Sequence, residues 1–272
     1  MSPRTEALVV HLFVAADSEH RADDLARLRS TWQACGSALG MTGRVPDIDL
    51  DPKAGWDDDG TRSTGLLAAR TRPGSGVCQA VLRREHDVFC LSAVLEPDSA
   101  EGVGWAELDR RWSAAAGGSW PGVLGVARLF LARTADSAAV PEAVRTGVPA
   151  DPAAPLAWRE RGITVPQGFA VWEASSRVDT RPERRLVVLA AEDRDVELSA
   201  WTWLGAGLEL PPLAKYLLHA AKMRYQLRVW KAAEGVGNLR READTIIQRL
   251  LAAVGPTWEP GRGPSWWRRS AS

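Results

Sequence analysis

LPPLAKYLLHAAKMRYQLRVWKAAEGVGNLRREADTIIQRLL, from Leu210 to Leu251, is the most informative stretch of the chain. Its two prolines, Pro211 and Pro212, indicate a helix start, because the first turn does not need the N–H that proline lacks. Apolar residues then recur at helical spacing on one face: Leu213, Tyr216, Ala220, Met223, Leu227 and Trp230. The sequence GVGN at 235–238 predicts a break and a cap, followed by a second apolar stripe. The stretch therefore predicts a helical hairpin.

A basic flank accompanies this hairpin. Its members are Lys215, Lys222, Arg224, Arg228 and Lys231. Such a flank either contacts phosphates or an acidic partner surface, or is solvated while its long side chains cover apolar surface. The chain also holds 13 Trp, and aromatic anchors with flanking arginines often carry interface energy. The predicted partner-binding surface comprises Trp201, Trp203, Tyr216, Lys222, Arg224, Arg228 and Trp230.

Upstream of the hairpin, the apolar patterns predict an α+β protein. Strands are expected at 7–15, 76–84, 87–96 and 122–133, and helices at 17–39 and 103–116. The order βαββαβ is typical of a ferredoxin-like layer. A β-hairpin at 168–175 and 183–191 and a short helix at 195–203 should follow.

Four parts are predicted along the chain. Residues 1–134 form the α+β domain, and the Ala- and Pro-rich residues 135–167 form a connector with a short helix near 140–145. Residues 168–254 form the β-hairpin plus the helical hairpin. Residues 255–272 form a flexible tail that contains Trp266, Trp267, Arg268 and Arg269.

Composition narrows the function classes. The 272 residues include 34 basic and 34 acidic side chains, and this balance disfavours nucleic acid as the main partner. No apolar run approaches the ~20 residues that a membrane span needs. Three cysteines without a secretory leader indicate reduced thiols and a cytoplasmic protein.

The cysteines lack a catalytic context. Gln33–Gly36 (QACG) resembles the start of the caspase nucleophile motif, but Cys35 falls inside a helical pattern rather than after a strand. The only upstream histidines are His11 and His20, so a buried helix cysteine is the favoured interpretation. No phosphate-binding loop and no GxSxG elbow is present, and we expect no catalytic residue and no cofactor.

Two metal-binding possibilities are weak. Cys78, His86 and Cys90 could meet across the predicted hairpin at 76–96, but a zinc site would need a fourth ligand. The alternating aspartates at 47, 49 and 51 begin like a calcium loop, yet Pro52 occupies the position where glycine is required. Together with Asp57–Asp59 they form an acidic loop, for which solvation is the default interpretation. We therefore expect no metal site.

Six blocks of sequence resemble one known family. They are QAVLRREHDVFCL (79–91), WAELDRRW (105–112), GFAVWE (168–173), ERRLVVL (183–189), DVELSAWTW (195–203) and LPPLAKYLLHAAKMRYQLRVW (210–230). In combination they resemble the actinobacterial family CATRA, for caspase and TPR repeat associated. The resemblance implies an accessory component of a bacterial conflict, or defence, system, encoded beside caspase-like proteases and TPR proteins. It supplies no catalytic residues.

The first functional expectation is thus a non-enzymatic adaptor that binds a caspase-like protease or a TPR protein. Two alternatives belong to other classes. A ferredoxin-like sheet can stack bases, which would suit a nucleotide or nucleic-acid sensing module, although the predicted strands lack the aromatic pairs of an RRM. A hydrolase that uses Cys35 or Cys78 is the other alternative.

Overall fold

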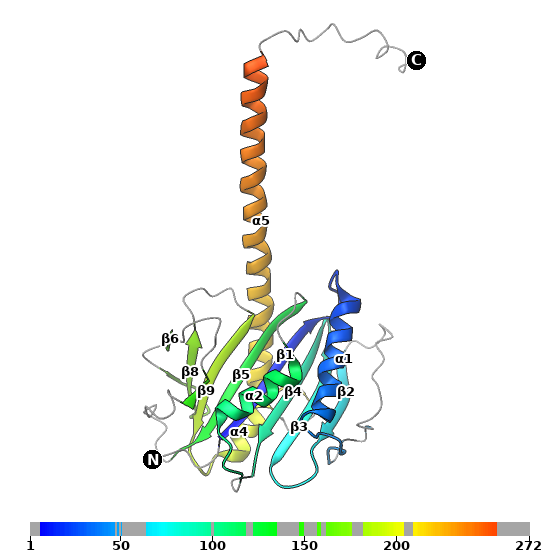
Figure 1. The fold of residues 1–272 in the computed structure, drawn as a ribbon. Helices are drawn as coiled ribbons and strands as arrows, with labels where there is room; N and C mark the ends of the chain where they lie inside the picture. Colours follow the sequence, from blue (N-terminus) through cyan, green and yellow to red (C-terminus); the bar gives the residue numbers. More distant parts are fainter. Residues whose placement is uncertain are drawn as a thin grey trace. The chain divides into compact units, whose positions relative to one another are not determined.

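The structure is a computed structural model that divides into two compact units, Met1–Tyr225 and Gln226–Ser272. It describes residues 6–46, 48, 50, 64–98, 101–117, 122–134, 147–149, 157–158, 162–175, 182–203 and 209–254. The acidic-loop residues 47, 49, 51 and 57–59, the expected helix at 140–145 and the tail at 255–272 lie outside these residues. Figure 1 shows the order of the elements along the chain.

A single nine-stranded mixed sheet forms the centre of the first unit. Its strands are β1 (Glu6–Ala15), β2 (Thr64–Thr71), β3 (Val77–Glu85), β4 (Val88–Glu96), β5 (Val123–Arg133), β6 (Ala157–Trp158), β7 (Ile163–Thr164), β8 (Ala170–Ser175) and β9 (Glu183–Ala190). The order is β2-β3-β4-β1-β5-β9-β8-β6, and β7 also pairs with β8. Because β9 pairs in parallel with β5, strands from both sides of the predicted connector belong to one sheet.

The α+β class is confirmed, but the sheet is larger than the four-stranded ferredoxin-like layer that the sequence predicts. In the order β3-β4-β1-β5, each strand is antiparallel to its neighbours. The sheet then continues with β2 beyond β3 and with β9, β8 and β6 beyond β5, so a separate ferredoxin-like layer is not shown. The sequence does not predict β2, which precedes the β3–β4 hairpin and pairs antiparallel with β3.

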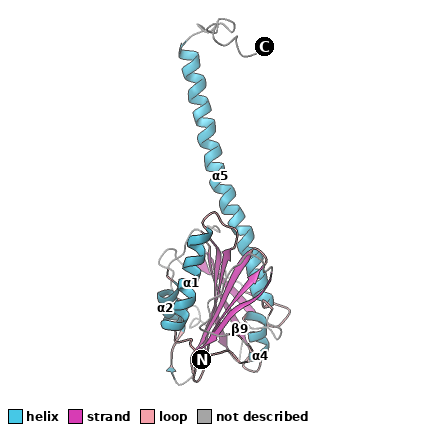
Figure 2. Ribbon diagram, turned by 90° about the vertical axis from the view of Figure 1, so that its right-hand side faces the viewer, coloured by secondary structure: helices cyan, strands magenta, loops and turns pink. Residues whose placement is uncertain are grey.

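Helices cover both faces of the sheet, as Figure 2 shows. On one face, α1 (Arg21–Ser37) and α2 (Trp105–Ala116) bury Leu28, Trp32, Trp105 and Trp112 against alternate residues of β1 such as Leu8 and Leu12. On the other face, α4 (Asp195–Thr202) and the first turns of α5 (Pro212–Val254) bury a second cluster around Val9 and Phe13. Burial on both faces explains why β1 reads as a nearly continuous apolar run.

The predicted helical hairpin is wrong, because α5 is one helix of 43 residues. It begins at Pro212, as predicted, and continues through Gly235 and Gly237. Glycine costs a helix only about 1 kcal/mol relative to alanine, and neither glycine takes a positive φ. Without a proline or a left-handed residue at 235–238, nothing forces the chain to turn there.

Among the described helices, none is long and apolar enough to cross a membrane.

Candidate partner-binding surface

A cavity of about 480 Å³ lies at the edge of the sheet in the first unit. Its walls come from β7, β8 and β9, from the turn after β7, from α4 and from the first two turns of α5. The lining is mainly apolar: Ile163, Val165, Pro166, Val171, Leu186, Trp201, Pro212, Leu213, Tyr216 and Leu217, with Gln167, Glu173 and Arg184 as the polar members. An apolar cavity with a few polar groups is the usual form of a binding site.

Two residues of the predicted surface, Trp201 and Tyr216, line this cavity. Trp201 extends from α4 and packs against Phe169, with ring centroids 5.3 Å apart. The Arg194 guanidinium lies 5.5 Å from the centre of the same phenyl ring. Tyr216 is different, because it makes no such ring contact in the described part of the chain and 67% of it is exposed. The cavity therefore combines a fixed indole with an accessible phenol.

An ion pair between Glu173 of β8 and Arg184 of β9 supplies the charge of the cavity. Both side chains are mostly buried, with 13% and 17% of their surfaces exposed. The Nε–H of Arg184 has no hydrogen-bond partner among the described residues. The sequence does not predict this pair, since the two residues meet only through the β8–β9 pairing. The two blocks GFAVWE and ERRLVVL, which contain them, were the only signal.

Two other predicted residues have structural contacts. Trp203 is buried in the second core cluster. Lys222 donates a 2.5 Å hydrogen bond to Asp87 in the turn between β3 and β4. This hydrogen bond from Lys222 lowers the pKa of Asp87. Lys222 thus joins α5 to the sheet within the first unit.

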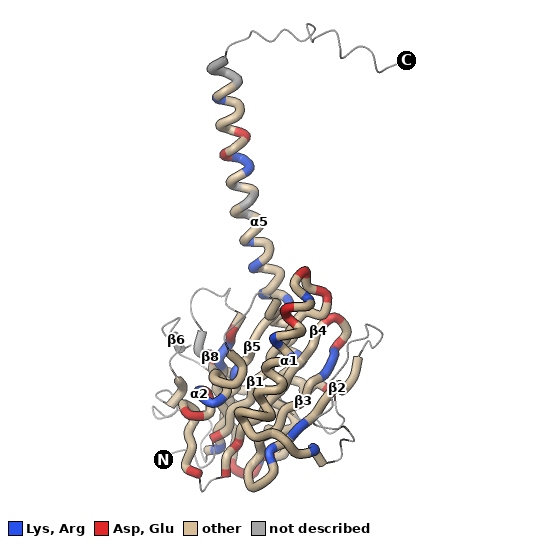
Figure 3. The backbone as a smooth tube through the Cα atoms, turned by 45° about the vertical axis from the view of Figure 1, so that its right-hand side comes forward, with Lys and Arg blue, Asp and Glu red and all other residues tan. Residues whose placement is uncertain are grey.

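The remaining predicted residues do not line the cavity. Arg224 is half-buried and belongs to the first unit, whereas Arg228 and Trp230 belong to the second. Trp230 is 59% exposed. The charged residues of α5 from Pro212 to Lys231 are all basic. After Lys231, the helix carries both acidic and basic residues (Figure 3).

A buried network of charges anchors α2 to the sheet. Arg128 of β5 and Arg185 of β9 each bind both Asp109 of α2 and Glu183 of β9, which closes a ring of alternating charges. Arg128 also donates to Ser113 at 2.8 Å. The two arginines and Asp109 are each less than 9% exposed. Such a ring balances its own charge, so it is explained by structure rather than by a ligand.

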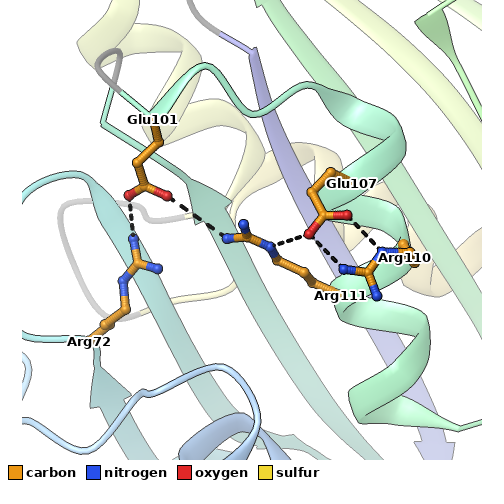
Figure 4. Close-up of polar contacts among 5 residues, drawn as sticks. All are labelled: Arg72, Glu101, Glu107, Arg110 and Arg111. Atoms are coloured by element: carbon orange, nitrogen blue, oxygen red, sulfur yellow. Dashed lines mark hydrogen bonds and ion pairs between the residues drawn. The ribbon is translucent and has the colours of Figure 1, made fainter.

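A second network lies on the surface beside α2 (Figure 4). Glu107 accepts from Arg110 and Arg111, and Arg111 reaches Glu101, which also pairs with Arg72 at 3.3 Å. Hydrogen bonds from the two arginines lower the pKa of Glu107 to about 2. Exposed pairs of this kind are screened by solvent and contribute little to stability.

The environment of the cysteines disfavours nucleophilic chemistry. All three are buried, and burial raises the pKa of Cys35 to about 12 and also raises the pKa of Cys78 and of Cys90. A thiol nucleophile needs an accessible thiolate, which these positions do not offer. Cys78 and Cys90 also lie in core clusters on opposite faces of the sheet, so the hairpin does not bring them together. No group of potential metal ligands occurs among the described residues.

His11 is the most unusual polar residue of the core. Its Nε2–H donates to the carbonyl oxygen of Thr202 at 2.9 Å, and its Nδ1 accepts from the Ser92 hydroxyl at 2.9 Å. Burial lowers the pKa of His11 to about 4, so the ring is neutral near pH 7. The histidine and Ser92 are both buried away from the cavity, so His11 joins β1, β4 and the end of α4.

Two family models match nearly the whole chain. The model described as "CASPASE and TPR Repeat-Associated N-terminal domain" matches residues 7–205, and the corresponding C-terminal domain model matches residues 211–271. The boundary between them falls between α4 and α5, ahead of the division between the compact units. No curated protein and no solved structure matches the chain.

Proposed function

Because the chain belongs to the CASPASE and TPR repeat-associated (CATRA) family, we propose that it is a non-enzymatic adaptor which binds a caspase-like protease or a TPR protein. The proposal places it in the cytoplasm, as an accessory component of an actinobacterial conflict system. The observation that carries the proposal is the cavity between the sheet edge and α4 and α5, with Trp201 and Tyr216 in its wall.

The chemistry of the cavity suits an apolar side chain on a partner protein. Tryptophan and tyrosine are enriched among residues that dominate binding energy, especially where they line a water-excluding depression. The Glu173–Arg184 pair at the same site can exchange hydrogen bonds with the partner's main chain. The partner's anchor would therefore be a large apolar residue within an otherwise polar segment.

The alternatives find less support. Helices cover both faces of the sheet, so no open sheet face is left in the described part for stacked bases. The three thiols are buried and their pKa values are raised, which disfavours a cysteine hydrolase.

The test is a titration of the purified chain with a purified caspase-like protease and with a purified TPR protein from the same gene neighbourhood. Tyr216→Ala should weaken binding by about 30-fold, corresponding to the ~2 kcal/mol typical of an interface hot spot. Trp201→Ala should do the same, and its melting curve checks that loss of the Phe169 contact has not unfolded the protein. Val196→Ala, on the exposed side of α4, is the matched control and should bind normally. Unchanged affinity in both cavity variants would exclude this surface.

A further inference from the structure

The part of α5 in the second unit carries a heptad repeat. From Val229 onward, apolar residues alternate at spacings of three and four: Val229, Ala232, Val236, Leu239, Ala243, Ile246, Leu250 and Ala253. These are the a and d positions of four consecutive heptads, with Val229 and Leu250 at a, and Leu239 and Ile246 at d. Four heptads without a polar a or d residue are typical of a coiled coil.

The a and d residues form an apolar seam along the helix, and the members whose burial the structure describes are exposed. Val229, Leu239, Ile246 and Leu250 are each more than half exposed, and no described residue covers them. The helix also contains Gly235 and Gly237, each of which costs about 1 kcal/mol relative to alanine. A helix in water owes most of its stability to packing of its apolar face. The exposed apolar seam therefore indicates that this part of the helix packs against a partner helix.

The composition of the seam favours a second copy of the same chain. The first two heptads carry valine at both a positions and leucine at one d position, the combination that favours two strands, whereas the last two carry alanine and leucine at a and isoleucine and alanine at d. In a parallel dimer in register, each seam residue meets its own copy, so every layer is apolar. The flanking g and e′ positions would pair Arg228 with Ala233, Gly235 with Arg240, Glu242 with Ile247 and Arg249 with Val254. None of these pairs places two like charges together.

We infer that residues 226–254 of α5 form a parallel two-stranded coiled coil with a second copy of this chain. This interface is separate from the cavity at Trp201 and Tyr216, so the dimer and the partner-binding surface can be tested independently. A dimer would carry two copies of the cavity. It would therefore bind more tightly, through avidity, to a partner that carries two copies of the recognised segment.

The first experiment measures the mass of the full chain in solution by light scattering coupled to gel filtration, over a range of concentrations. The expected mass is twice the 29.5 kDa of one chain. Ile246→Asp should raise the dissociation constant at least about 100-fold, because it buries a charge in the seam. Leu227→Asp is the matched control, since Leu227 is exposed on the same helix but lies at an f position away from the seam. A monomer at every concentration, or equal effects of the two variants, would overturn the inference.

The second experiment tests orientation. Ala232→Cys places one thiol per chain at a d position, where a parallel register brings the two copies face to face. A short bismaleimide should join the two chains of this variant and leave the native chain, with its buried cysteines, unlinked. A dimer that this reagent does not join would exclude the parallel register.

Discussion

Leu218 and Leu227 belong to the same helix but to different units, and their surroundings differ. Leu218 packs in the second core cluster and is 5% exposed, whereas Leu227 is 49% exposed. The first unit buries its apolar residues on both faces of a sheet, whereas Val229, Leu239, Ile246 and Leu250 of the distal part of α5 are more than half exposed. The contrast shows that helical periodicity predicts an apolar face but not whether that face packs within the chain or against another molecule.

The largest effect is expected in the buried charges of the first unit. Asp109→Ala should lower the free energy of unfolding by about 4 kcal/mol, because it leaves Arg128 and Arg185 without one of their two carboxylate partners. Chemical denaturation measures this loss. Glu107→Ala, on the exposed side of the same helix, should leave the midpoint almost unchanged. Equal losses in the two variants would mean that burial does not set the difference.

The comparison within α5 comes next. Leu218→Ala should cost about 3 kcal/mol, the usual effect of a cavity left in a core. Leu227→Ala should change the unfolding free energy by less than about 0.5 kcal/mol, as expected of an exposed position. Denaturation curves of the two variants, recorded at one protein concentration, provide the measurement. A large loss in Leu227→Ala would show that this residue is covered in solution.

His11 makes the first unit sensitive to pH. Its pKa in the folded state, about 4, lies below the ordinary value of 6.5, so the unfolded chain binds the proton more readily. The neutral His11 ring makes its full contribution to the free energy of unfolding above pH 6.5. This contribution is lost as the pH falls from 6.5 towards 4, and the total loss is on the order of 3 kcal/mol. His11→Gln keeps a donor and an acceptor but does not titrate. Its unfolding free energy should therefore fall less steeply than that of the native chain over this range, and parallel curves would contradict the assignment.

The smallest effect is expected in the distal helix. Gly237→Ala should stabilise the helix by about 0.5 to 1 kcal/mol, because a Cβ at this position meets nothing within 4 Å and the backbone is helical. Circular dichroism at 222 nm during heating would register the change as a later loss of helix. Leu227→Gly, at an exposed position of the same helix, should shift the transition in the opposite direction.

Much of the fold could be predicted from local patterns. The predicted strands at 7–15, 76–84, 87–96 and 122–133 match β1, β3, β4 and β5 to within one residue at each end, since apolar runs and turns are local signals. β2 was missed because Thr64–Thr71 follows a polar stretch and has only a short apolar core. The prediction of a helical hairpin depends on glycine ending the helix, but the cost of glycine is too small to end a helix whose heptads continue beyond it.

The candidate site was predicted only in part. Trp201 and Tyr216 line the cavity as members of the predicted surface, but Trp203 is a core residue and Lys222 binds Asp87. The sequence cannot separate the two cavity residues from the two structural ones, because an aromatic or basic residue in or near a helix fits the same sequence pattern whether it lines a cavity or packs within the fold. The difference depends on which part of the sheet each side chain reaches. Trp201 and Tyr216 line the cavity at β7, β8 and β9, whereas Lys222 reaches the turn between β3 and β4.

The position of β1 has a consequence during protein synthesis. Of the strands in the sheet, β1 leaves the ribosome before the others, yet it lies inside the sheet and pairs with β4 and β5, which end at Glu96 and Arg133. Its apolar segment LVVHLFVA consequently waits for about 80 further residues before its first neighbour is available, which at 5 to 20 residues per second takes several seconds. Over that interval the nascent chain exposes a strand with two open edges, so ribosome-associated chaperones are expected to engage this segment before the sheet closes.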